Sequence, residues 1–282
     1  MSNAQIEEVT RFIVGSIPTF VSIDNLMHTH RNTPGVERCG KVAIAASILE
    51  AERACVALNG HSGGPNWRHE LLLNSWYIPL IKTVTTGATA SSPDDVLANV
   101  TFVIFNYDRC IEHFLHHALR RALGIHAEKA AEIIRDAAIL HPYGSVGSLP
   151  SMGEGAPISF GQKHDESDFD LNEVSAGIRT FTEEQSSESA AEIRAAVAKA
   201  ELIVFLGFGY IEQNMEMLKP TVGNNLRECL GSAYCVSEDN RGEIERALHS
   251  MFHWENRRIN FLALKDQRCR AFFDEHNRRI AG

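Results

Sequence analysis

Short apolar runs that stop at polar residues constrain the fold of this chain more than any other feature of its sequence. The clearest run covers residues 100–105 and ends at Asn106, Tyr107 and Asp108. Its β-branched and aromatic residues predict a buried strand, and a helical pattern follows over about 109–123. In open α/β sheets, ligands bind where strands end and helices begin. We therefore expect Asn106 and Asp108 to lie at a functional edge of a sheet.

Four further apolar runs alternate with helical patterns. They predict strands at 137–141, 201–206, 233–236 and 259–264. Helices are expected at about 127–135, 182–200, 211–218, 239–249 and 266–280. Strands that alternate with helices predict an α/β fold with a doubly wound, mostly parallel, Rossmann-like sheet. The Gly-, Pro- and Ser-rich stretch between the second and third strands should be irregular.

The first 99 residues have a different, helical character. An Ala-rich stretch from Cys39 to Leu58 predicts a long buried helix, and residues 67–85 predict another. Ser22 is placed to cap the start of a helix. We expect residues 1–99 to form a helical layer or insertion on a core of residues 100–282, within one composite domain.

Composition excludes several classes of protein. The formal net charge of −9 argues against a basic nucleic-acid surface. The six cysteines form no C-x-x-C pair, so we expect no metal site of the four-cysteine zinc type. No apolar run approaches the roughly 20 residues of a membrane-spanning helix. Scattered thiols without a secretory signal favour a cytoplasmic protein.

Charged and histidine side chains on the predicted helices have simple interpretations. The neighbouring His116 and His117 fit an exposed helix flank. Glu50, Glu52 and Arg53 fit a solvated face or an ion pair.

Asn106 and His141 follow two predicted strands that should end at the same edge. The Asn106 amide both donates and accepts hydrogen bonds, so it could orient a water or a ribose hydroxyl. It fits equally well as the cap of the next helix. His141 titrates near neutral pH and could act as a base, although a buried, hydrogen-bonded histidine is the simpler interpretation of that residue alone.

A third strand end carries Gly207, Phe208 and Gly209, with Asn214 further along. A helix that starts there would present free N–H groups to a phosphate. The third glycine of a G-x-G-x-x-G loop is missing, so a tight strand-to-helix turn explains the same residues. Ser237, after the fourth predicted strand, could meet an adenosine group or cap the following helix.

The order of these motifs resembles that of the sirtuin-like domain family. The motifs are Phe-Asn106-Tyr-Asp108, then His141-Pro-Tyr-Gly-Ser, then Phe-Leu-Gly207-Phe-Gly209-Tyr with a later Asn. The similarity is greatest to bacterial sirtuin-like NAD+ hydrolases, many of which act in antiphage defence. The segments 22–26, 40–44 and 48–52 resemble the helical insertion of those proteins, so the resemblance covers nearly the whole chain.

This resemblance implies a function and a site. Asn106 would be catalytic, His141 would be the general base, and Asp108 would lie near the nicotinamide ribose. The Gly207–Gly209 turn, with Asn214 and Ser237, would bind the dinucleotide. NAD+ would be the substrate, cleaved to nicotinamide and ADP-ribose without a metal, because the pyridinium is already an activated leaving group. Such effectors often assemble, so a homo-oligomer is also expected.

Two departures from the family pattern keep alternatives open. The Gly-Ala-Gly-x-Ser loop of the family is not found, and the glycines at 60–64 follow a helical pattern instead of a strand. A catalytically silent nucleotide sensor or scaffold is therefore an alternative. The zinc-binding cysteines of deacetylase sirtuins are absent, which makes protein deacylation the weaker inference. The opening Met1-Ser-Asn-Ala resembles a tag remnant, from which we expect the natural chain to begin elsewhere.

Overall fold

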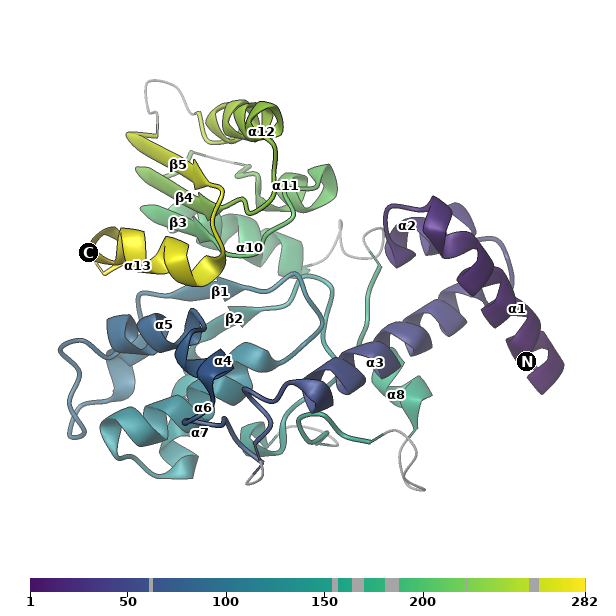
Figure 1. The fold of residues 1–282 in the computed structure, drawn as a ribbon, viewed down its shortest axis with the longest axis horizontal. Helices are drawn as coiled ribbons and strands as arrows, with labels where there is room; N and C mark the ends of the chain where they lie inside the picture. The colour runs from purple at the N-terminus through teal and green to yellow at the C-terminus, as the bar shows by residue number, and fades with distance from the viewer. Residues whose placement is uncertain are drawn as a thin grey trace.

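A computed structural model describes residues 1–60, 63–153, 157–163, 170–180, 188–221, 223–253 and 259–281. Figure 1 shows two small sheets in one lobe, with a helical arm that carries the N-terminus away from them. The protein is thus a mixed α/β structure, as predicted.

Helices make up the first 99 residues, as predicted. They are α1 (Asn3–Ser16), α2 (Ile23–Thr29), α3 (Val36–Ala54), α4 (Glu70–Leu73) and α5 (Tyr77–Val84). Ser22 caps α2, because its hydroxyl accepts a hydrogen bond from the Asn25 N–H at 3.1 Å. The single helix expected over 67–85 is instead divided into α4 and α5.

The strands form two separate parallel sheets among the described residues. β1 (Thr101–Val103) pairs with β2 (Ala138–Leu140), and β3 (Leu202–Phe205), β4 (Glu228–Ser232) and β5 (Phe261–Lys265) pair in that order. Parallel pairing is confirmed, whereas a single doubly wound sheet is not what these residues form. The helices of this half are α6 (Cys110–Leu123), α7 (Ala127–Asp136), α8 (Leu171–Ser175), α10 (Glu188–Lys199), α11 (Glu212–Leu218), α12 (Glu238–Met251) and α13 (Cys269–Ile280).

The position predicted for the fourth strand was wrong. The strand β4 covers Glu228–Ser232, and residues 233–236 form the turn that follows it. Gly231 interrupts the apolar run at this position, so the sequence pattern did not indicate a strand there. The structure uses this glycine for close packing, since an added Cβ would collide with Tyr210 and Leu264. The helix expected over 182–200 is present as α10 (Glu188–Lys199), and its first six residues, 182–187, lie outside the described residues.

The last helix joins the two sheets. Phe272 of α13 packs with residues of the β3–β4–β5 sheet, whereas its neighbour Phe273 packs in the apolar cluster of α5, α6 and α7 that also covers β1. Figure 1 shows α13 lying across both sheets. The two sheets therefore pack into one lobe, with α13 in contact with both.

The histidines of α6 are packed in the structure, which corrects their expected exposure. His116 is buried and His117 half-buried. His113, also buried, stacks on Phe160 with ring centroids 4.0 Å apart and forms a hydrogen bond with the Leu58 carbonyl at 2.9 Å. Burial lowers the pKa of His113, and likewise that of His117, to about 4. These imidazoles are therefore neutral at pH 7.

We predict that His113 makes the protein sensitive to mild acid. Its pKa is lower in the folded chain than in the unfolded chain, so stability is complete above about pH 6.5 and falls as the pH drops toward 4. A shift of this size corresponds to about 3 kcal/mol. Urea unfolding at pH 7 and pH 4.5 should show a smaller loss of stability for His113→Gln than for the wild type. The exposed His126→Gln is the control, and equal pH dependence in all three proteins would contradict the prediction.

A buried ion pair links α3 to the start of α6. Glu52 and Arg109 are each 1% exposed, and their side chains meet at 2.6 Å. The Arg109 guanidinium also donates to the carbonyls of Ile158 and Ser159, and Glu52 accepts from the Gly161 N–H. Glu52 was expected on a solvated face or in an ion pair; the ion pair is present but fully buried.

Substituting Glu52 should destabilise the fold strongly. Glu52→Gln leaves the Arg109 charge buried without its counter-charge, and such a loss costs about 3–5 kcal/mol. Glu50, two residues earlier on the same helix, forms an exposed pair with Arg53, so Glu50→Gln should cost less than about 1 kcal/mol. Urea unfolding of both variants at pH 7 measures the difference. Similar losses in the free energy of unfolding of the two variants would contradict this prediction.

Candidate functional site

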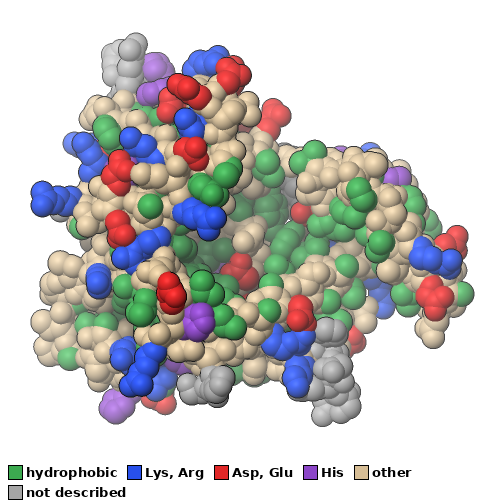
Figure 2. Space-filling view, in the orientation of Figure 1, with side chains coloured by type: hydrophobic (Ala, Val, Ile, Leu, Met, Phe, Trp, Pro, Cys, Tyr) green, Lys and Arg blue, Asp and Glu red, His purple; other side chains and the backbone are tan. Residues whose placement is uncertain are grey.

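The ends of the first three strands lie together. Beyond β1, the Phe105 ring contacts the Phe208 ring beyond β3 at a centroid distance of 5.0 Å. Beyond β2, the Tyr143 hydroxyl donates to Asn214 Oδ1 at 2.6 Å. Figure 2 shows a recess with hydrophobic side chains between the sheet-bearing lobe and the helical arm. The predicted convergence of these strand ends is therefore present in the structure.

His141 follows β2 and is paired with a carboxylate. Its Nε2 lies 2.7 Å from Glu112 Oε1, and the two side chains are only 13% and 15% exposed. Burial lowers the pKa of His141, but the hydrogen bond and charge of Glu112 raise it, and the Asn106 backbone and Asp108 act in the same direction. The net result is a raised pKa. His141 Nδ1 and Glu112 Oε2 are buried without a geometrically satisfactory hydrogen bond to any described residue.

Asp108, and not Asn106, forms the hydrogen bond to the first turn of α6. Asn106 is exposed and does not cap α6, so that interpretation was wrong. Asp108 Oδ1 instead accepts the Cys110 N–H at 3.1 Å, which satisfies a free donor of the first turn of α6. The Asn106 side chain consequently stays available beside His141, whereas one Asp108 oxygen is occupied.

The Gly207–Gly209 segment forms a tight turn. Gly207 has φ +63, a left-handed conformation that suits glycine, and its N–H donates to Ser232 Oγ at 3.0 Å. That donor is therefore not free for a phosphate. Phe208 of the turn is half-buried and also stacks on Phe205. The turn therefore contributes a packed side chain and does not offer the Gly207 N–H to a ligand. We call the side chains gathered at these strand ends the strand-end cluster: Phe105, Asn106, Glu112, His141, Tyr143, Phe208 and Asn214.

Asn214 and Ser237 lie in different settings. Asn214 is buried and held by Tyr143, inside the strand-end cluster. Ser237 is exposed and caps α12, because its hydroxyl accepts the Asn240 N–H at 3.3 Å. No contact among the described residues connects Ser237 with the other predicted site residues. The helix-cap interpretation of Ser237 is thus confirmed, and a role in binding stays a prediction.

Two residues of the cluster were missed from the sequence. Glu112 looks like a first-turn acid that complements the helix dipole. Its pairing with His141 becomes visible only when α6 packs beside β2. Tyr143 forms part of the His-Pro-Tyr motif, but its hydrogen bond to Asn214 crosses from one sheet to the other.

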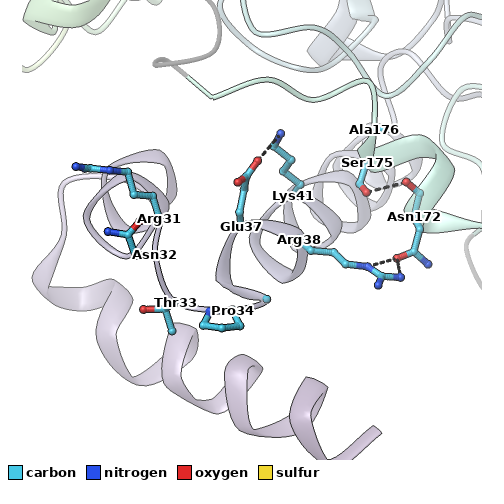
Figure 3. Close-up of a pocket in the computed structure, with 11 residues that line it drawn as sticks. Arg31, Asn32, Thr33, Pro34, Glu37, Arg38, Lys41, Asn172, Ser175 and Ala176 are labelled. Atoms are coloured by element: carbon cyan, nitrogen blue, oxygen red, sulfur yellow. Dashed lines mark hydrogen bonds and ion pairs between the residues drawn. The ribbon is translucent and has the colours of Figure 1, made fainter. Parts of the chain in front are cut away.

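A separate cleft of about 510 Å³ lies on the helical arm, away from the strand ends. Figure 3 shows it between the α2–α3 connection and α8. Arg38 donates to Asn172 Oδ1 at 2.9 Å and Lys41 pairs with Glu37 at 3.0 Å. Of these two interactions, the Arg38–Asn172 hydrogen bond joins α3 to α8 at the cleft.

Comparison with protein-family models, curated proteins and solved structures returns no match for this chain. The sirtuin-like resemblance therefore stays a prediction. In the part of the chain that the structure describes, no three His, Cys, Asp or Glu side chains gather as metal ligands. No described helix is both long and apolar enough to cross a membrane.

We predict that Glu112 sets the pKa of His141. In Glu112→Gln the carboxylate charge is lost while the burial remains, so the pKa of His141 should fall below its ordinary value. NMR titration of the His141 ring protons measures this change. Glu132→Gln, on the exposed side of α7, is the control. An unchanged His141 pKa in Glu112→Gln would show that the pair has no electrostatic consequence.

Proposed function

We propose that this protein binds NAD+ at the strand-end cluster and hydrolyses its nicotinamide–ribose bond. The observation that carries the proposal is the His141–Glu112 pair next to Asn106, at the ends of two adjacent parallel strands. Pairing with a carboxylate fixes the orientation of an imidazole and raises its basicity, which suits a general base. The family resemblance of the motifs supplies the choice of NAD+.

In the proposed reaction, the anomeric C–N bond breaks and its electron pair leaves with neutral nicotinamide. A water oxygen bonds to the anomeric carbon and passes its proton to His141, which gives ADP-ribose. Glu112 stabilises the resulting imidazolium, and Asn106 orients the water through its amide. The Asp108 carboxylate adds negative charge close to the cation that develops on the ribose.

Nicotinamide release from NAD+ by the intact protein tests this function. Asn106→Ala and His141→Ala should each lower the rate by about 10²–10⁴-fold, the usual contribution of a positioned acid–base group. His126→Gln, at the exposed start of α7, should leave the rate within about twofold, because His126 is not one of the residues at the three strand ends. Activity should decrease as the pH falls below the raised pKa of His141, because the base is then protonated. Release that is insensitive to Asn106 and His141 would refute the assignment.

A catalytically silent nucleotide-binding module is the second candidate. The bond of the Gly207 N–H to Ser232 favours it, since this bond removes one expected phosphate donor. Calorimetry with ADP-ribose separates the candidates: binding without nicotinamide release supports the module, and binding with release supports the hydrolase. Cytoplasmic location, homo-oligomerisation and the absence of nucleic-acid binding stay predictions.

A further inference from the structure

Tyr107 lies between Asn106 and Asp108 of the candidate site, and it is held at both its backbone and its hydroxyl. Only 9% of its surface is exposed. Its backbone carbonyl accepts a hydrogen bond from the Val146 N–H at 3.2 Å. Its hydroxyl donates to the Asp24 carboxylate, with Oδ1 at 3.2 Å and Oδ2 at 3.4 Å. The backbone next to Asn106 is therefore fixed both from the lobe and from the helical arm.

Asp24 lies on α2, and packing fixes the position of this helix. Leu26 of α2 is fully buried among residues of α1 and α3, and Met27 belongs to the same apolar cluster as Tyr107. Asp24 itself is half-buried. Burial raises the pKa of its carboxyl group, although the hydrogen bond from Tyr107 acts in the opposite direction. The helical arm thus presents a partly desolvated carboxylate to the end of β1.

The Asn106 side chain has no support of its own. It is exposed, and it forms no hydrogen bond to any residue that the structure describes. The position of its amide therefore depends on the backbone, which the neighbours on either side hold. On one side, the Phe105 ring packs against the Phe208 ring at a centroid distance of 5.0 Å. On the other side, Tyr107 is held by Asp24.

We propose that Asp24 is a positioning residue, which holds the Asn106 amide in place for the reaction through the Tyr107 hydroxyl. This inference rests on the proposed function and adds the helical arm to the site. A hydrogen bond to an ionised group is about twice as strong as a neutral one, so a carboxylate suits this role. Misplacement of a reacting group by about 1 Å can lower a rate about 100-fold. One hydrogen bond behind Asn106 is therefore enough to control turnover.

Nicotinamide release by variants of the intact protein tests the proposal. Tyr107→Phe removes the hydroxyl and keeps the ring, whereas Asp24→Ala removes the acceptor. Each should lower kcat by about 10–100-fold with little change in KM, because a misplaced Asn106 weakens the transition state and not substrate binding. The double variant should be no slower than either single variant, since both changes remove the same hydrogen bond.

A conservative variant and a matched control separate positioning from general stability. Asp24→Asn keeps an oxygen that accepts from Tyr107, so it should recover about half of the lost activation free energy and fall only about three- to tenfold. Arg38→Ala breaks another hydrogen bond of the arm, to Asn172 at the α8 cleft, and should leave kcat unchanged.

NMR adds a measurement that needs no turnover. The side-chain amide signals of Asn106 should shift in Tyr107→Phe and in Asp24→Ala but not in Arg38→Ala. Because Tyr107→Phe keeps an aromatic ring at this position, a shift in that variant reports displacement of Asn106 and not the loss of a ring current.

The possible failures can be told apart. A wild-type protein that releases no nicotinamide would refute the proposed function, and the NMR comparison then decides alone whether Asp24 positions Asn106. Unchanged Asn106 signals in both Tyr107→Phe and Asp24→Ala would overturn the inference. Losses of kcat that multiply in the double variant, or an equal loss in Arg38→Ala, would also overturn it, because the arm would then act through stability.

Discussion

The buried pair of Glu52 and Arg109 is the interaction on which the arrangement of this protein depends. Arg109 comes directly after Asp108, at the point where the chain leaves β1 and enters α6. Glu52 holds it through the backbone N–H and the guanidinium together, and the remaining guanidinium donors reach the loops at 147 and 158–159. One charge pair thus positions the helical arm, the strand end and the loop behind it. A fully desolvated pair of this kind tolerates little displacement, because each charge lacks water as an alternative partner.

The geometry of the candidate site depends on the Glu52–Arg109 pair. Arg109 fixes Asp108 and the start of α6, and Glu112 lies in the first turn of that helix. Glu112 in turn determines where the His141 imidazole lies, although His141 belongs to another strand. On the opposite side, Tyr107 donates to Asp24 of α2 at 3.2 Å, which ties the arm to the same strand end. Positions that look independent in the sequence therefore form one connected network.

Local patterns were enough to predict some of this architecture. The apolar run at 100–105 and the helical stretch after it correctly placed β1 and α6, since both depend on local periodicity. The position of β4 could not be predicted, because Gly231 interrupts its apolar run. The glycine is required there by the close approach of Tyr210 and Leu264, which are distant in sequence. The burial of Glu52 and of the α6 histidines was also missed. A charged or titratable residue on a helix looks solvent-exposed until its partner, far away in sequence, is known. The same limit hid Glu112, whose partner His141 is 29 residues away.

The position of α13 has a consequence for how the chain folds during synthesis. Arg270 of this helix donates to the carbonyls of Leu73 at 2.9 Å and Ser75 at 3.2 Å, and Phe273 fills the cluster over β1. These contacts join the last helix to residues made almost 200 positions earlier. Because residues 73–75 and β1 leave the ribosome long before α13 does, the cluster over β1 can close only after α13 has been made. This part of the core should therefore form late and slowly, as expected when non-local contacts complete a core.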